Sequence, residues 1–119
     1  MHMAKTAYTN NATPIRSDID IEYDAIAQIT RQIKHAMAEN NYGKLVEALH
    51  QNRQLWTLFL GAVADEDNLL PTDIRANIFY LAQFTNIHTS NVLKGTATPD
   101  ALLEVNMSVM RGLKQGKTA

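Results

Sequence analysis

The fold is decided by the stretch LVEALHQNRQLWTLFLGAVA at residues 45–64. Apolar side chains recur in it three and four positions apart, which places them on one face of an α-helix. This stripe consists of Leu45, Val46, Leu49, Trp56, Phe59, Leu60 and Val63. The acidic stretch at residues 65–68 ends the pattern, so we predict a helix from about Tyr42 to Ala64.

The segments at the two ends of the chain show the same helical spacing. The first begins near Ser17 and breaks at Asn40-Asn41. Its apolar positions are Ile19, Tyr23, Ile26, Ile29, Ile33 and Met37. The last segment begins with Thr98 as cap and Pro99 at its first helical position, and it ends near Leu113.

A further helix is predicted from near Pro71 to Gly95, because proline suits a helix start and glycine the position after a helix end. Its apolar side contains Ile74, Ile78, Leu81, Phe84, Ile87 and Val92, widened by Phe79 and Leu93. No strand pattern competes with these four segments. We therefore predict an all-α fold, a small bundle of about four amphipathic helices at residues 18–113. Residues 1–17 are expected to form a flexible tail, and residues 114–119 a frayed C-terminus.

The composition excludes several classes of function. The 119 residues carry a net charge of −1 and no cysteine, which removes disulfide scaffolds, zinc fingers, iron–sulfur sites and thiol nucleophiles. A balance of 11 basic and 12 acidic residues supplies no excess of positive charge for binding nucleic acid. The sequence contains neither a transmembrane run nor a secretory signal, so a cytoplasmic location is expected.

No motif supports catalysis or metal binding. Glu47 and His50 have the Glu-x-x-His spacing of di-iron bundles, but the chain contains no second pair of this kind. The acidic residues 65–68 lack the glycine and the terminal glutamate of a calcium loop. A helix-turn-helix that ends in the 98–113 segment would bring Asp100 and Glu104 against phosphate. We expect no enzyme activity, no cofactor and no metal.

Polar residues interrupt the decisive stretch between Leu49 and Trp56, where Asn52 and Arg53 stand at positions of the apolar stripe. One interpretation is a buried hydrogen-bond network that fixes the helix register, with Arg53 paired to an acid such as Asp73. The other is a polar step in an apolar groove that holds a partner helix. The sequence leaves both open.

The 71–95 segment has more apolar surface than one inward stripe can bury, most clearly in the run IFYLAQF at residues 78–84. Some of this surface must face a neighbouring helix or a partner. The predicted partner-binding residues are Asn52, Arg53, Trp56, Arg75, Asn77, Phe79, Tyr80 and Phe84. Arg75 is also the only cation between Leu60 and Leu93.

The chain resembles the FlaF family of flagellar biosynthesis proteins in LVEALHQNRQLWT (residues 45–57) and in the stretch from Leu70-Pro71 to IRANIFYLAQFT (residues 74–85). Residues 106–112 and Glu22-Tyr23 also fit. The resemblance implies a small cytoplasmic, all-helical protein of flagellated alphaproteobacteria. It further implies a role in flagellin production and export, with flagellin and the regulator FlbT as partners.

The working hypothesis is a flagellin-binding protein, acting as chaperone or as regulator of flagellum assembly, that takes an amphipathic partner helix. An alternative is post-transcriptional control of flagellin messenger RNA, directly or together with FlbT. Direct contact would use a modest basic patch of Lys94, Arg111, Lys114 and Lys117. A third possibility is a structural subunit that self-associates through its surplus apolar face. The sequence leaves the oligomeric state undetermined.

Overall fold

The computed structural model describes the backbone of residues 18–67 and 70–118 and the side chains of residues 23–67 and 70–114. Four helices make up this part of the chain: α2 (Asp18–Ala38), α3 (Tyr42–Ala64), α4 (Thr72–Leu93) and α5 (Asp100–Thr118). The prediction of an all-α bundle is confirmed. The predicted tail at residues 1–17 lies outside the described residues. No described helix is long and apolar enough to cross a membrane.

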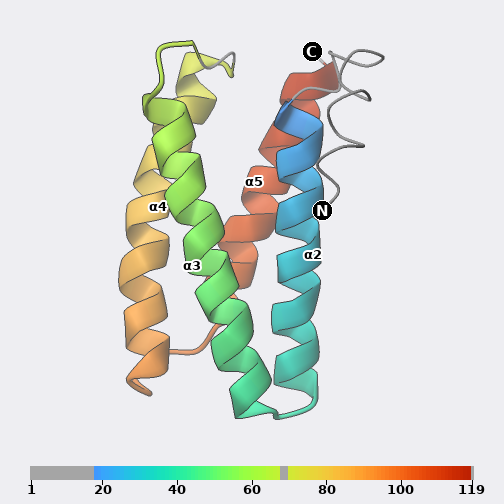
Figure 1. The fold of residues 1–119 in the computed structure, drawn as a ribbon, viewed down its shortest axis with the longest axis vertical. Coiled ribbons are helices and arrows are strands. Elements are labelled where there is room, and N and C mark those ends of the chain that lie inside the picture. The colour runs from blue at the N-terminus through green and yellow to red at the C-terminus, as the bar shows by residue number, and fades with distance from the viewer. Residues whose placement is uncertain (1–17, 68–69, 119) are drawn as a thin grey trace, which may run out of the picture.

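The helices form an up-and-down bundle in which each runs antiparallel to the next (Figure 1). Short connections between consecutive helices favour this arrangement. α2 and α4 each contact both α3 and α5, so α2 and α4 occupy diagonal corners of the bundle. The outer surface of α4 therefore faces away from α2.

Local backbone signals set the turn between α2 and α3. Asn40 adopts a left-handed conformation with φ of 52°, which asparagine tolerates better than most residues. The side chain of Asn41 then accepts a hydrogen bond from the Lys44 backbone N–H at 3.0 Å and caps α3. These two residues make the break that the sequence predicts at Asn40-Asn41.

The end of α4 agrees with the prediction, whereas the two ends of α5 differ from it. Gly95 follows α4 with φ of 82°, as predicted for the position after a helix. α5 begins at Asp100, and the Leu103 backbone N–H donates to the Pro99 carbonyl at 3.2 Å. The Thr98 hydroxyl donates to the Asp100 carboxylate at 3.0 Å and caps no backbone N–H, unlike the predicted cap. The helix then continues to Thr118, beyond the end predicted near Leu113.

The core consists of two apolar clusters separated by a polar layer. The first cluster contains Ile26, Trp56, Phe59, Val63, Leu70, Ile78, Ala82, Val109 and Leu113. The second contains Ile33, Ala48, Leu49, Val92, Leu102 and Leu103. The polar layer consists of Thr30, Asn52, Thr85, Thr89 and Asn106, all buried. Each of the four helices thus supplies at least one polar residue between the two clusters.

Candidate functional site

Asn106 is the centre of the polar layer. Its side-chain oxygen accepts a hydrogen bond from the Trp56 indole N–H at 2.9 Å. Its amide nitrogen donates to the Asn52 side-chain oxygen at 2.9 Å and to the Thr30 hydroxyl at 3.1 Å. Asn52 and Trp56 therefore lie in the interior, and Asn52 has no exposed surface. This geometry matches the interpretation of Asn52 as part of a buried register network.

The threonines of α4 lie in the polar layer but are not hydrogen-bonded to Asn106. The Thr89 hydroxyl donates to the Thr85 carbonyl at 2.7 Å, within α4 itself. The Thr85 hydroxyl and the Asn52 amide nitrogen are buried without a hydrogen-bond partner. Each unpaired buried group of this kind costs about 1–3 kcal/mol. Asn106 therefore bonds the layer together across α2, α3 and α5, while the two unpaired groups lie on α3 and α4.

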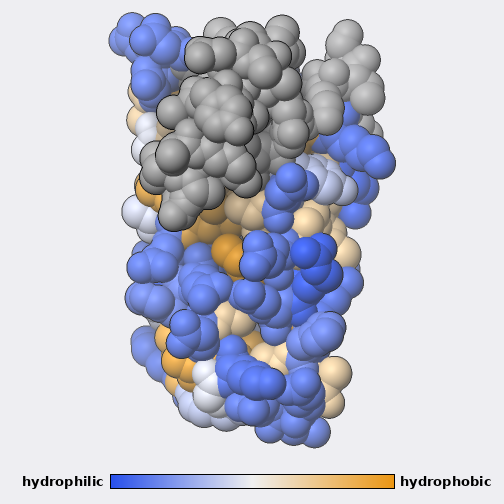
Figure 2. All heavy atoms as spheres, turned by 45° about the vertical axis from the view of Figure 1, so that its right-hand side comes forward, coloured by the Kyte–Doolittle hydropathy of each residue, from blue (hydrophilic) through white to orange (hydrophobic). Residues whose placement is uncertain are grey.

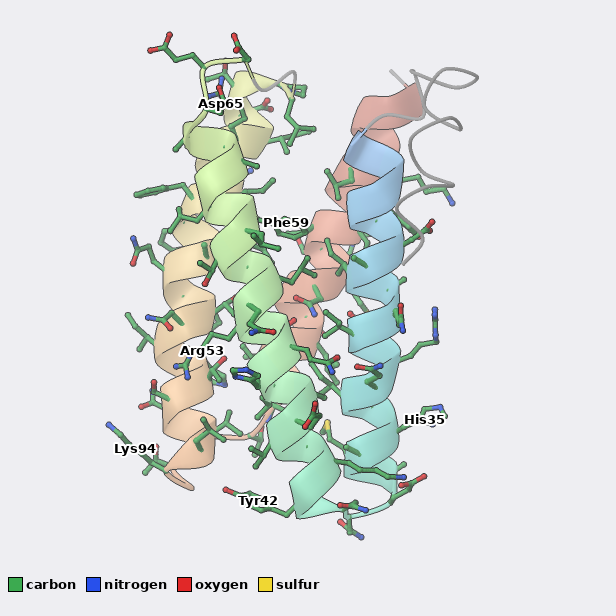
Figure 3. All side chains as sticks on the ribbon, in the orientation of Figure 1. His35, Tyr42, Arg53, Phe59, Asp65 and Lys94 are labelled. Atoms are coloured by element: carbon green, nitrogen blue, oxygen red, sulfur yellow. The ribbon has the colours of Figure 1, made fainter. Side chains whose placement is uncertain are left out.

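Arg53 connects α3 to α4. Its guanidinium donates to the Asn86 side-chain oxygen at 2.9 Å, to the Asn86 carbonyl at 2.7 Å and to the Ser90 hydroxyl at 2.6 Å. Figure 3 labels Arg53 between the two helices. The expectation that Arg53 pairs with an acid such as Asp73 is wrong, because α3 and α4 are antiparallel. That register brings Arg53 to the last third of α4, whereas Asp73 lies in the first turn.

Arg75 makes the second connection between the same two helices. Its guanidinium donates to the Val63 carbonyl at 2.8 Å and to the Asp65 carbonyl at 3.1 Å. These carbonyls belong to the C-terminal end of α3, where helical carbonyl groups lack backbone partners and carry partial negative charge. Arg75 therefore caps α3 from a neighbouring helix, a role that the sequence analysis did not identify.

The exposed surface of α4 carries the other predicted residues. The exposed fraction is 53% for Phe79 and 68% for Tyr80, and Asn77 is also exposed. Phe84 is half-buried and stacks on His88, with 5.2 Å between ring centroids. These four residues lie on the half of α4 that points away from the core, which we call the outer face of α4. Of the predicted residues, Asn52 and Trp56 are buried and therefore not accessible to a partner helix, whereas Arg53 and Arg75 are half-buried.

Ile87 also belongs to the outer face of α4, with an exposed fraction of 62%. The prediction placed Ile87 and Phe84 with Ile78 on a single apolar side. The structure turns Ile78 inward, together with Ala82 and Thr85, and Ile87 outward. Nine residues make about two and a half helical turns, so Ile78 and Ile87 lie on opposite sides of α4. Leu58 on α3 is exposed as well, at 70%, and was not predicted.

A small cavity opens at the seam between α3 and α4, beside the outer face of α4. Its volume of about 140 Å³ lies below the 300–1,000 Å³ typical of ligand pockets. It is lined by Arg53, Trp56, Thr57, Leu60, Ala82, Gln83, Thr85 and Asn86. A depression of this size next to exposed aromatic residues suits a single inserted side chain better than a free small molecule.

A larger groove of about 680 Å³ lies between α2 and α3, lined in part by Arg31, His35 and Glu47. Its rim is polar, and Lys44 and Glu39 on this rim form an ion pair at 3.1 Å. Figure 2 shows the side of the bundle that lies to the right in Figure 1, where hydrophilic residues predominate outside the grey atoms. A surface of this kind is stable in water, so it is a weaker candidate for a partner-binding site than the outer face of α4.

No group of three or more metal-ligating residues occurs among the described residues. Glu47 and His50 are both exposed on α3. The expected absence of enzyme activity stays a prediction.

Comparison with protein families gives a match. The family model described as Flagellar protein FlaF matches residues 4–113, which is most of the chain. Neither the curated proteins nor the solved structures gave a match. The matched range contains all of α2, α3 and α4 and most of α5. The chain therefore belongs to the FlaF family of flagellar proteins.

Proposed function

We propose that this flagellar protein binds flagellin and supports its synthesis and export, as a chaperone or as a regulator of flagellum assembly. The observation that carries the proposal is the sorting of side chains on α4. This helix buries Thr85 and Thr89 and exposes Phe79, Tyr80 and Ile87. Buried polar groups and exposed large apolar groups are the informative departures from ordinary burial, and α4 combines both.

The outer face of α4 fits an amphipathic partner helix. Tyr80, Phe84 and Ile87 follow one another at spacings of four and three residues, so they share one side of α4. A partner helix would meet them with apolar residues at positions i, i+3, i+4 and i+7. The stretch 76–93 of α4 contains no Asp, Glu, Lys or Arg, which supports a partner recognised by helix packing.

The test is calorimetric titration of the protein with purified flagellin. We expect binding with a Kd of tens of micromolar or tighter. The double variant Tyr80→Ser/Ile87→Ser should weaken binding at least tenfold, as expected for the loss of central aromatic and aliphatic contacts. Leu58→Ser is the matched control, because Leu58 is equally exposed but lies on α3. Absence of binding by the unaltered protein would refute the proposal.

The alternative of direct contact with flagellin messenger RNA has less support. Lys94 lies at the end of α4, whereas Lys114 lies near the far end of the antiparallel α5 (Figure 1). The proposed patch is therefore divided between opposite ends of the bundle, and the side chain of Lys117 lies outside the described residues. Adding FlbT to the same titration tests the indirect route, in which a protein partner contacts the message.

A further inference from the structure

The exposed side of α4 carries a straight stripe at coiled-coil spacing. Its centre consists of Asn77, Tyr80, Phe84, Ile87 and Asn91, separated alternately by three and four residues. This is the spacing of the a and d positions of a heptad, which keeps a seam aligned with a second helix. The same spacing continues to Asp73 at one end and to Lys94 at the other.

The chemistry of this stripe is nearly symmetric about Phe84. Apolar residues occupy the middle, asparagines flank them, and residues of opposite charge stand at the two ends. Asp73 and Lys94 are both exposed and about 30 Å apart at 1.5 Å per helical residue. Neither forms an ion pair with another residue that the structure describes.

Further acidic residues add to one end of the stripe. Asp65, Glu66 and Asp67 are exposed in the turn that precedes α4. Figure 3 places Asp65 and Lys94 at opposite ends of the bundle. The guanidinium of Arg75 lies at the acidic end but is half-buried against carbonyl groups of α3. The exposed charge is thus negative at one end of the stripe and positive at the other.

We propose that the stripe binds a second copy of this chain, with the two α4 helices antiparallel. In this arrangement the acidic end of each copy meets Lys94 of the other, and the contact is repeated by two-fold symmetry. The apolar centres meet in the middle, and the asparagines lie near one another. A parallel pair would bring the acidic ends together and would be opposed by repulsion.

The expected dimer is weak. A single helix–helix contact lies at or below the low end of specific interfaces, which bury about 1,200 Å² or more. We therefore expect a dissociation constant for the dimer in the micromolar to millimolar range. A partner helix with higher affinity for the outer face of α4 would displace the second copy. The proposal concerns this chain alone and holds whether or not flagellin is the partner.

Sedimentation velocity of the full chain, from about 10 μM to about 1 mM, tests the proposal. The weight-average mass should rise from 13.3 kDa towards twice that value. Ile87→Lys should abolish the rise, because it places a charge at the centre of the stripe. A constant monomer mass over the whole range would overturn the proposal.

A charge swap tests the antiparallel orientation. Lys94→Glu should weaken dimerisation about tenfold, since it replaces two attractions by two repulsions. The swap variant Asp73→Lys/Lys94→Glu should recover part of this loss, because the two altered positions then attract each other while Asp65, Glu66 and Asp67 keep their negative charge. Lys34→Glu on α2 makes the same charge change on the diagonal helix and should leave dimerisation unchanged. A swap variant as weak as Lys94→Glu alone, with circular dichroism unchanged, would overturn the orientation.

Discussion

α2 and α4 occupy diagonal corners of one bundle, and both bury apolar residues beside threonine, but they expose different kinds of side chain. α2 buries Ile26 and Ile33 and exposes charged residues such as Asp24, Arg31 and Lys34. α4 buries two threonines and exposes large aromatic and aliphatic residues. The first pattern is that of a helix whose contacts are complete within its own fold. The second is that of a helix with a further contact to make.

Hydrogen bonding separates the two helices in the same way. α2 is bonded into the polar layer through Thr30, which accepts from Asn106. α4 is held to α3 by Arg53 and Arg75, while its own buried threonine hydroxyl at Thr85 is unpaired. The centre of the bundle thus specifies where α2 lies, and two peripheral arginines specify where α4 lies. Substitutions at these two sets of bonds test the comparison.

The largest effect is expected for Asn106→Ala, which breaks the layer on the side of α2. The substitution leaves the Trp56 indole, the Asn52 amide and the Thr30 hydroxyl without their partner in the interior. We expect a loss of about 2–4 kcal/mol in the free energy of unfolding, measured by urea denaturation. Ser108→Ala, at an exposed position of the same helix, should change it by less than about 0.5 kcal/mol. A loss below about 1 kcal/mol for Asn106→Ala would show that the layer does not stabilise the bundle.

Arg75→Ala should have the next largest effect, about 2 kcal/mol, because it removes bonds from a charged donor to the end carbonyls of α3. Arg75→Lys keeps the charge but not the forked geometry, so it should recover about half of this loss. Hydrogen exchange should show faster opening of the last turn of α3 and the first turn of α4. Unchanged exchange at both places would contradict the capping role.

Arg53→Ala should cost about 1–2 kcal/mol, since it removes three hydrogen bonds at a half-buried position. It also separates the two interpretations of this residue. If Arg53 only holds α4 in place, flagellin binding should weaken no more than the loss of stability accounts for. Loss of binding with an unchanged free energy of unfolding would instead assign Arg53 to the partner surface.

The helices themselves could be predicted because their signals are local. Asn41 caps α3, Pro71 immediately precedes α4 and Gly95 follows it, and each of these acts within a few residues of the helix end. The sequence leaves the role of Asn52 open between a buried network and a partner site, because its hydrogen-bond partner Asn106 lies on another helix. Only the packed register of the bundle brings the two side chains together.

The direction of Ile87 could not be predicted for a different reason. α4 is apolar around most of its circumference, so helical spacing alone does not show which stripe faces the core. The side of α4 that faces the core is the one with the small residues Ala82 and Thr85, which the other helices of the bundle cover. The predicted surplus of apolar surface on α4 is present, but Ile87 lies on the outer face and not on the side of Ile78.

Thr85→Val should have a smaller effect and the opposite sign. Valine has the shape of threonine without the buried hydroxyl, which has no hydrogen-bond partner here. We expect the free energy of unfolding to rise by about 0.5–1 kcal/mol. Thr89→Val is the comparison, because the Thr89 hydroxyl is bonded to the Thr85 carbonyl and its loss should not stabilise the protein. Destabilisation by Thr85→Val would mean that this hydroxyl is satisfied in solution.

The smallest effect on stability is expected where the effect on binding is largest. Tyr80→Ser and Ile87→Ser remove side chains that are mostly exposed, so each should change the free energy of unfolding by less than about 0.5 kcal/mol. This must be measured at low concentration, where the proposed dimer does not contribute. Ile33→Ser on α2 is the contrast, because a buried isoleucine replaced by a polar residue should cost several kcal/mol. Equal losses at Ile87 and Ile33 would mean that the exposed stripe of α4 is part of the core in solution, and the difference between the two helices would then vanish.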